Sequence, residues 1–324
     1  MIKIKKIKKI INQFQNFKKL SKNNKKNFDS KKLRTFKVLI LSTIFANFLL
    51  LIISYYNFID KKISEYQEIS NHIATNFEGF LNYSQLLLNS VNHEILKNKI
   101  FNDKTVDILS SIDRVRRQNN IANEMYFEGM LYWIDSNKYL IASSAGKVLK
   151  PIDLSSRDYL EKSEHEPNKL QIGKVIVGAL SGQNIIPIAV GLDSEKGNHI
   201  GTSVLSVKIE SLISKINISL RRNFTNFAII SKDGKIVYET NKYLLNKKII
   251  NKISKNDHLK TGVVSNFKIW NRHSNLVVAS PVIDHPFIIV YSDDKKQIYR
   301  DLWRNLLPYF INIFVLLIIY YKMI

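Results

Sequence analysis

Two uncharged apolar segments, one near each end, constrain the fold of this chain more than any other feature. Val38–Tyr56 runs for 19 residues without a charged side chain, and a helix of that length crosses a hydrocarbon core of about 30 Å. Leu306–Tyr321 is a second uncharged run, close to the C-terminus. A chain with a span at each end places everything between them, residues 60–301, on one side of the membrane. A segment of that length indicates a folded region rather than a connecting loop.

The charge ahead of the first span predicts the orientation. The net charge of the chain is +22, and residues 1–37 carry 14 Lys and Arg against one acid, Asp29, a net +13. Positive residues beside a span stay in the cytoplasm, so we expect a two-pass inner-membrane protein with both termini cytoplasmic and residues 60–301 periplasmic. The same charge favours contact with anionic lipids of the bilayer. No zinc-finger, homeodomain or RNA-binding pattern accompanies it, so no nucleic-acid partner is expected.

Hydrophobic periodicity organises the first half of the exported region. From Lys61 to Lys99 apolar residues recur at intervals of about 3.6, which predicts one long helix with a continuous apolar stripe. A second helical pattern places its apolar residues at Val106, Leu109, Ile112 and Val115. The pattern then changes to short apolar runs between turn residues, which is typical of strands. The expected strands are Met125–Asp135, Tyr139–Ser143, Leu170–Leu180, Asn184–Gly191 and Ile200–Lys208.

A smaller α/β unit follows a connector helix expected at Ile209–Leu220. Asp233-Gly234 is a hairpin signal within it, and a helix from Lys295 is expected to continue into the second span. The sequence therefore predicts an α+β fold with a long N-terminal helix and two antiparallel sheets carrying helices. The expected segments are a basic tail (1–36), a first span (37–58), a long helix with a membrane-distal module (59–208), a connector with a membrane-proximal module (209–301) and a second span with the C-terminus (302–324).

The basic tail leaves two interpretations open. Its Ile and Lys residues alternate closely over the first eleven positions. Such a pattern fits a short amphipathic helix lying on the inner leaflet, and it fits a disordered cytoplasmic tail equally well.

Residues 152–181 resemble a known sensor motif. Asp153–Leu160 reads DLSSRDYL, which is similar to the DLSxRxYF segment of double Cache (PDC-type) extracytoplasmic sensors, and Ile172-Gly173-Lys174-Val175 with Gly178 and Ser181-Gly182 is similar to their IGxPVxGxxSG segment. The order of span, long helix, larger module, smaller module and second span also resembles that family. The resemblance covers roughly residues 37–321, and it implies two PAS-like (Cache) modules of a bacterial membrane receptor.

The resemblance also implies a binding site around Arg157. The planar guanidinium of an Arg suits a carboxylate, because it makes two parallel charge-assisted hydrogen bonds. The expected ligand-binding residues are Arg157, Tyr159, Ser155, Ser156, Lys174, Tyr126, Trp133 and Ser143. Alternatives stay open for several of them. Arg157 fits a structural ion pair with Asp153 or Asp158, and Tyr126 and Trp133 fit core packing. Ser155 and Ser156 fit helix capping, and Lys174 fits a solvated strand residue equally well.

Catalytic and metal-binding patterns are missing from the sequence. Its seven His residues are scattered without metal-ligand spacing, and it has no Cys. His165 lies among Glu161, Glu164 and Glu166, a group better interpreted as a solvated loop. There is no Gly-rich phosphate loop, nucleophile elbow or kinase motif. We therefore expect no enzyme activity, no metal and no cofactor.

The expected function is sensing of a small anionic ligand in the distal module, with transmission through the two spans. Amino-acid-binding family members carry Arg-x-Trp-Tyr where this chain has Arg157-Asp158-Tyr159-Leu160, which does not favour a free amino acid. Family members continue into a kinase, cyclase or chemoreceptor output, whereas only three residues follow Tyr321. We therefore expect signalling through a homodimer or a separate cytoplasmic partner. Two other hypotheses remain, a non-signalling remnant of a split receptor gene and a structural membrane protein that binds a periplasmic protein.

Overall fold

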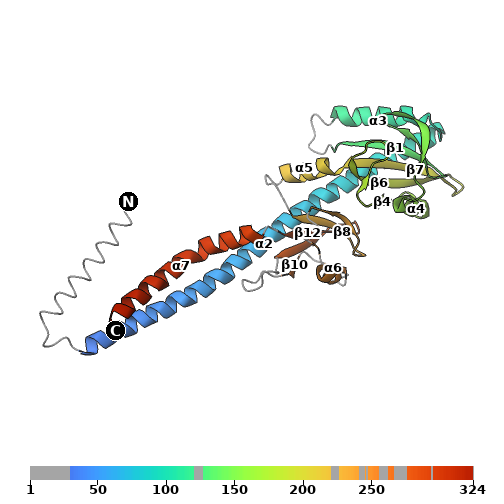
Figure 1. The fold of residues 1–324 in the computed structure, drawn as a ribbon. Coiled ribbons are helices and arrows are strands. Elements are labelled where there is room, and N and C mark those ends of the chain that lie inside the picture. Colours follow the sequence, from blue (N-terminus) through green and yellow to red (C-terminus); the bar gives the residue numbers. More distant parts are fainter. Residues whose placement is uncertain are drawn as a thin grey trace. The chain divides into compact units, whose positions relative to one another are not determined.

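The computed structural model describes residues 30–119, 127–219, 226–240, 245, 247–254, 262–265, 276–292 and 295–323. Figure 1 shows the α+β fold expected from the sequence, with antiparallel sheets and a long apolar helix near each end of the chain. The described helices are α2 (Ser30–Asn98), α3 (Thr105–Asn119), α4 (Asp158–His165), α5 (Ile209–Ser219), α6 (Lys247–Ser254) and α7 (Lys295–Met323). The two interpretations of the basic tail concern residues that lie mostly outside this described part.

The described strands form two antiparallel sheets, one on each side of α5 in the sequence. The first has the order β3-β2-β1-β7-β6-β4, with β5 also paired to β6. The second has the order β10-β11-β12-β8-β9. The strands of the first sheet are β1 (Gly129–Asp135), β2 (Tyr139–Ser143), β3 (Gly146–Asp153), β4 (Leu170–Ile172), β5 (Ile176–Val177), β6 (Asn184–Asp193) and β7 (His199–Lys208). Those of the second are β8 (Phe227–Ser231), β9 (Ile236–Glu239), β10 (Gly262–Ser265), β11 (Val277–Pro281) and β12 (Phe287–Ser292).

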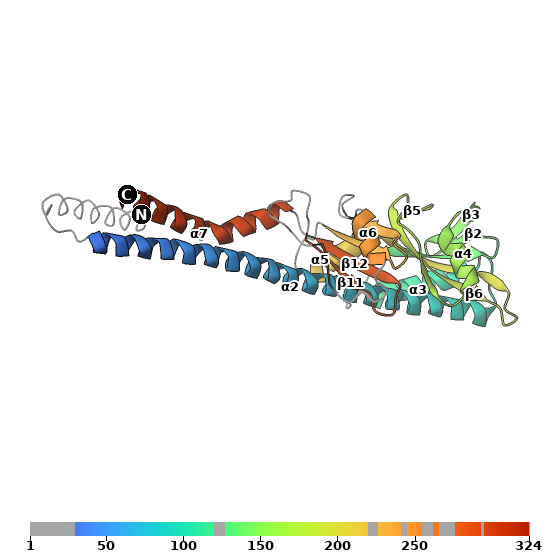
Figure 2. The same cartoon turned by 90° about the horizontal axis from the view of Figure 1, so that it is seen from below.

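Helices cover the first sheet on both faces. Helix α4 packs on one face, where Tyr159 and Leu160 join a buried cluster with Tyr132 and Ile134 of β1 (Figures 1 and 2). Helices α2 and α3 lie on the other face, and Asn92 of α2 reaches the Val190 carbonyl of β6 at 3.5 Å. Because successive strand residues point to opposite faces, each inner strand of this sheet buries both sets of side chains.

From Lys61 onward the apolar stripe of α2 packs against other residues of the same compact unit, as its periodicity predicts. Buried aromatic residues of the stripe contact aromatic residues that the sequence places far away, with ring centroids 5.2 Å apart for Tyr66 and Tyr291 and 4.4 Å apart for Phe80 and Phe127. At one turn Leu88 is buried completely in place of Leu87, and the stripe continues at Val91 and Ile95, which are also buried completely. Side-chain packing of this kind, rather than helix propensity, stabilises most protein helices.

The second sheet has a separate apolar core. Strands β8, β11 and β12 contribute buried residues to it, and α6 covers it with Leu245 just ahead of the helix and Ile249 and Ile253 on the helix. The expected turn at Asp233-Gly234 joins β8 to β9, and Gly234 has a φ of +82°, a conformation that favours glycine. The hairpin predicted from this dipeptide is confirmed.

The two apolar helices pair in a heptad-like register. The amide of Asn312 donates a hydrogen bond to the Asn47 side-chain oxygen at 3.0 Å, and the amide of Asn305 donates one to the Ser54 hydroxyl at 3.4 Å. From the first contact to the second, the residue number rises by seven on α2 and falls by seven on α7. This is the pattern of two antiparallel helices whose contacts repeat every seven residues. Figures 1 and 2 both show α7 alongside the first part of α2.

The structure departs from the sequence expectations at three places. Strand β3 was not expected at all, and the predicted strand at Leu170–Leu180 is divided into β4 and β5. The division has a physical cause, since the Val175 amide donates to the Val237 carbonyl of β9 at 3.4 Å and therefore leaves the β6 ladder. In α3, Val115 is 53% exposed whereas Asp113 and Arg116 are only 4% and 5% exposed, so the predicted apolar face of that helix is wrong at its C-terminal end.

Candidate functional site

A small cavity lies between the face of the first sheet that α4 covers, α4 itself and the loop that follows β5. The space open to the centre of a water-sized sphere is about 20 Å³, which is room for about one water molecule. Its walls are mainly aliphatic. The lining residues are Tyr132, Ile134, Leu140, Leu154, Arg157, Tyr159, Ile176, Ala179, Leu180, Ile185, Pro187, Val204 and Ser206.

Arg157 lies at the start of α4 and is half-buried against the cavity. Its extended backbone, with φ −89° and ψ 115°, makes it the N-cap residue of the helix. Within the described residues its guanidinium has no hydrogen bond or ion pair, so the alternative of a structural ion pair with Asp153 or Asp158 is not seen. The Asp153 carboxylate instead accepts the Ser155 amide at 2.8 Å, and this bond lowers the pKa of Asp153. Arg157 therefore places a cation beside the cavity, and the N–H groups of its guanidinium make no hydrogen bond to the described residues.

Tyr159 is the second residue of α4 and also lines the cavity. It is 4% exposed, and burial raises the pKa of its phenol to about 12. The phenol stays protonated at any physiological pH, so it is available as a hydrogen-bond donor. Its position depends on Gly173, because a Cβ at that residue would lie 2.7 Å from Cδ1 of Tyr159 and 2.7 Å from Cγ of Pro187. The glycine of the Ile-Gly motif thus leaves room for the tyrosine of the preceding motif.

Two further polar side chains of the cavity come from the sheet and were missed by the sequence analysis. Burial raises the pKa of Tyr132 on β1, and its hydroxyl lies 3.6 Å from Sδ of Met130. Ser206 on β7 lies close by, and its Oγ donates to the Met130 carbonyl at 3.5 Å. The signal that would have identified Tyr132 is strand alternation: once Trp133 is assigned to the core face, Tyr132 must face the other way.

Five of the other predicted residues do not line the cavity. Trp133 is fully buried on the opposite face of the sheet, and Ser143 is buried with its hydroxyl donating to the Gly146 carbonyl at 2.9 Å. Ser155, Ser156 and Lys174 are exposed. Of the seven predicted residues that the structure describes, Arg157 and Tyr159 line the cavity. Tyr126 lies outside the described residues.

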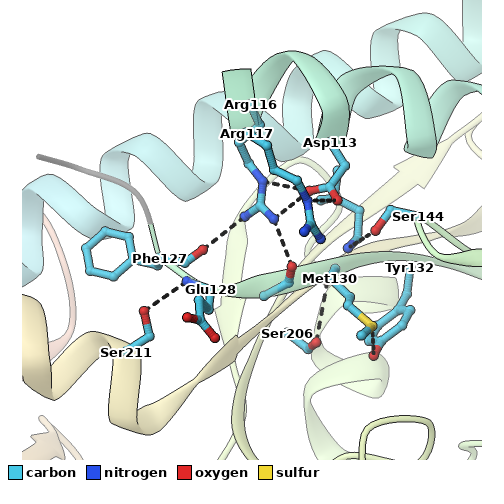
Figure 3. A network of polar contacts seen from close by, with 12 residues as sticks. Asp113, Arg116, Arg117, Phe127, Glu128, Met130, Tyr132, Ser144, Ser206 and Ser211 are labelled. Carbon is cyan, nitrogen blue, oxygen red and sulfur yellow. Dashed lines mark hydrogen bonds and ion pairs between the residues drawn. The ribbon is translucent and has the colours of Figure 1, made fainter. Parts of the chain in front are cut away.

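A buried ionic network holds β1, which carries Tyr132, against α3 (Figure 3). Asp113 accepts hydrogen bonds from Nε of Arg116 at 2.8 Å and from Nε of Arg117 at 2.8 Å. Arg116 also donates to the carbonyls of Phe127 at 3.3 Å and Gly129 at 2.8 Å, where β1 begins. Because Arg116 satisfies backbone groups as well as a carboxylate, the network fixes the end of the strand.

The loop after β5 forms the exposed rim of the cavity. Gly182 has a φ of +64°, and its amide donates to the Gly178 carbonyl at 2.9 Å. Between these glycines, Ala179 and Leu180 reach the cavity while remaining exposed. The left-handed backbone of Gly182 makes this turn tight, and a larger residue at that position would strain it.

The chain belongs to the Cache domain family, whose model matches residues 56–302. Membership agrees with the fold, with the order of the two sheets and with the motif around Arg157. The two apolar helices and the Cache domain fit a two-pass membrane protein. No curated protein sequence matches the chain.

Solved structures with the same fold are sensor domains of bacterial receptors. The extracellular domain of the putative histidine kinase rpHK1S-Z16 is 12% identical with a TM-score of 0.55, over 74% of this chain and 97% of that domain. The ligand-binding domain of the Campylobacter jejuni chemoreceptor Tlp3, solved with L-valine, is 14% identical with a TM-score of 0.51, over 76% and 98%. That of the Pseudomonas fluorescens chemoreceptor CtaA, solved with L-leucine, is 18% identical with a TM-score of 0.53, over 75% and 99%. At these identities the likeness establishes the fold.

Proposed function

We propose that this chain is the extracytoplasmic sensor of a bacterial signal-transduction receptor, and that it binds a small anionic ligand at Arg157. The observation that carries the proposal is the half-buried guanidinium without a partner among the described residues, beside an otherwise apolar cavity. A cation in such a position gains strong charge-assisted hydrogen bonds from a carboxylate. Ligand binding in solved relatives of the same fold supports a binding role rather than a catalytic one.

Transmission in this proposal uses helix α2 and the strands that rest on it. Helix α2 extends without a break from the first apolar segment to Asn98, and it contacts both sheets, through Tyr291 of β12 and through the Val190 carbonyl of β6. The Val175–Val237 hydrogen bond connects the segment after β4 to the second sheet. A ligand that favours one arrangement of α4 and this segment shifts the population of receptor states by its difference in affinity for them. In this proposal residues 60–301 face the periplasm and both termini face the cytoplasm, in keeping with the positive charge near the first span.

The experiment is a thermal-unfolding screen of the full chain in lipid nanodiscs against small acids, amino acids and amines. A ligand at 100 times its Kd stabilises the folded state by about 2.7 kcal/mol, which shifts the Tm by several degrees. We expect Arg157→Ala to abolish that shift. Arg114→Ala is the matched control, since Arg114 is an exposed arginine on α3 away from the cavity.

Two outcomes contradict the proposal. One is a screen in which no compound raises the Tm of the full chain. The other is a stabilising compound whose effect survives Arg157→Ala unchanged, because binding would then occur elsewhere.

A protein partner is the second candidate function, and one observation favours it. Strand β3 is an edge of the first sheet and Leu149 on it is 94% exposed, and an unpaired edge is a template for strand addition from another chain. Photo-cross-linking from position 149 in intact cells would capture a specific partner under this alternative. A receptor that acts only through a small ligand yields no defined cross-linked product there.

A further inference from the structure

The side chains that line the cavity include a positive charge and no negative charge. Among its lining residues Arg157 alone carries a charge at neutral pH, because the others are apolar residues, a serine and two tyrosines, which are protonated there. No Asp or Glu of the described residues lines the cavity. The site therefore offers a counter-charge to a carboxylate and none to an ammonium group.

The acids nearest in sequence do not supply the missing charge. Asp153 and Asp158 flank Arg157, but both are exposed and neither lines the cavity. Asp153 is also engaged by the Ser155 amide. An ammonium group carried into the cavity would lose its hydration without gaining a carboxylate, which is unfavourable for any buried charge.

The rest of the cavity suits a hydrocarbon chain. Its walls include Ile134, Leu140, Leu154, Ile176, Ile185 and Val204, from five different strands and the loop before α4. Apolar surface buried against such walls is a favourable contribution that grows with each methylene of the ligand. The polar groups are few, namely Arg157, the two tyrosine hydroxyls and Ser206.

We propose that the ligand is an aliphatic carboxylate without an amino group. The carboxylate pairs with the guanidinium of Arg157 and accepts from Tyr159, and the hydrocarbon chain lies against the aliphatic walls. This inference rests on the proposed function and names the ligand class for the same site. It sets this chain apart from the chemoreceptor domains of the same fold that were solved with L-valine or L-leucine.

The ligand enters by displacing side chains, since the closed cavity has room for about one water molecule. Leu180 is the exposed apolar residue of the rim, and it lies on the loop between Gly178 and Gly182. In this proposal outward movement of this loop opens the cavity to a ligand of several carbon atoms.

The test uses three matched compounds and isothermal titration calorimetry on the full chain in nanodiscs. L-Leucine carries an acid and an amine, 4-methylpentanoate is the same skeleton without the amine, and 3-methylbutylamine is the same skeleton without the acid. We expect 4-methylpentanoate to bind at least about tenfold tighter than L-leucine, the size of effect that one unpaired polar group produces. We expect no binding of the amine.

Variants then assign the binding to this site. Arg157→Gln keeps the size of the side chain and removes its charge, and it should abolish binding of 4-methylpentanoate while the Tm without ligand stays unchanged. Asp158→Asn is the matched control, because it removes a neighbouring charge that does not line the cavity, and it should leave the Kd within about twofold.

The outcomes separate this inference from the proposed function. Binding of L-leucine as tight as, or tighter than, that of 4-methylpentanoate overturns the inference and leaves the anionic-ligand sensor standing. The same holds if none of the three compounds binds but another anion of the screen stabilises the protein through Arg157. Binding of the amine overturns both, and a screen without any stabilising compound removes the proposed function itself.

Discussion

At the scale of single residues, the site depends on how closely Tyr159 approaches a neighbouring strand segment. The tyrosine ring packs where Gly173 has no side chain, and the Gly173 amide donates to the Pro187 carbonyl at 2.9 Å. Gly191 has the same role for α4, since a Cβ there would lie 2.0 Å from the Ser163 carbonyl oxygen. Two glycines thus set the distance between α4 and the sheet, and with it the depth of the cavity.

Gly173→Ala tests this dependence. The added methyl group would collide with Tyr159 and Pro187, so we expect the free energy of unfolding to fall by about 1–3 kcal/mol and ligand stabilisation to be lost. Thermal unfolding followed by circular dichroism measures both. The control is Gly79→Ala on α2, where the structure shows nothing within 4 Å of the added Cβ. That substitution should stabilise the helix by up to about 1 kcal/mol, and a Gly173→Ala protein that behaves like it would refute the packing argument.

The protonation states of Arg157 and Tyr159 predict how binding depends on pH. Burial raises the pKa of Tyr159 to about 12, so its hydroxyl keeps its proton and donates a hydrogen bond to a bound anion throughout the physiological range. A raised pKa means that the donor is lost only as the pH rises through that value. We expect the Kd of a carboxylate ligand to stay constant within about twofold from pH 6 to 9. A bell-shaped or sigmoidal change in calorimetric titrations over that interval would show that a histidine participates.

At the scale of elements, polar contacts rather than apolar ones decide how two of the helices are oriented. Helix α3 turns Arg116 inward and leaves Val115 exposed, because the arginine binds Asp113 and the backbone at the start of β1 (Figure 3). Helix α7 presents Asn312 to Asn47 within the apolar segments. A buried polar group without a partner is costly in either environment, so such pairs fix one register.

Asp113→Ala should be strongly destabilising. It removes the buried carboxylate that accepts hydrogen bonds from Arg116 and Arg117, and breaking a buried pair in this way costs about 3–5 kcal/mol. Thermal unfolding of the full chain should show a Tm loss of many degrees. Glu195→Ala, at an exposed turn position, should change the stability by less than about 0.5 kcal/mol. Equal effects of the two substitutions would mean that the network is dispensable.

The pairing of α2 with α7 is open to a direct test, because the chain has no native cysteine. The double variant Asn47→Cys/Asn312→Cys should form an intramolecular disulfide when membranes are oxidised. Phe48→Cys/Asn312→Cys should not, since Phe48 is exposed on another side of the helix. Electrophoresis without reductant separates the products. Efficient cross-linking of the control pair, or none of the first, would contradict the register.

At the scale of the whole molecule, the chain divides into two compact units. Residues 61–295 form one, with the two sheets and their cores, and the apolar helical segments on either side form the other. The unit formed by residues 61–295 contains two buried apolar clusters. One includes residues of β1, β7 and α4, and the other includes residues of β8, β11 and α6. A unit with such cores has what an independently folding domain needs.

Residues 61–295 should therefore fold without the spans. We expect the purified fragment to be soluble and to melt in a single cooperative transition measured by circular dichroism. A ligand found for the full chain should stabilise the fragment to the same extent, since its site lies entirely within these residues. A fragment that shows no cooperative transition would indicate that the membrane-spanning unit contributes to the fold.

Much of the architecture could be predicted from the sequence because it follows from local patterns. The apolar segments, the long α2 stripe, the α+β order and the Asp233-Gly234 hairpin depend on residues close together in the chain. The motif around Arg157 likewise marked one side of the cavity. Strand β3 was missed because it is an edge strand with few buried residues, so its pattern lacks the alternation that identifies a strand.

Only the tertiary structure decided which side chains meet at the site. A strand pattern shows that Tyr132 and Trp133 point in opposite directions, but not which of them faces α4. Ser206, Leu154 and Ile185 enter the cavity through strand pairing and a loop that bring distant segments together. Among the described residues Arg157 has no partner, and this is also a tertiary property, since its sequence neighbours Asp153 and Asp158 are both exposed and the Asp153 carboxylate accepts the Ser155 amide instead. The sequence by itself determined the expected membrane topology and identified Arg157 as the cation of the site, because these depend on composition and local spacing. The shape, depth and charge balance of the cavity depend on long-range packing, which local spacing does not contain.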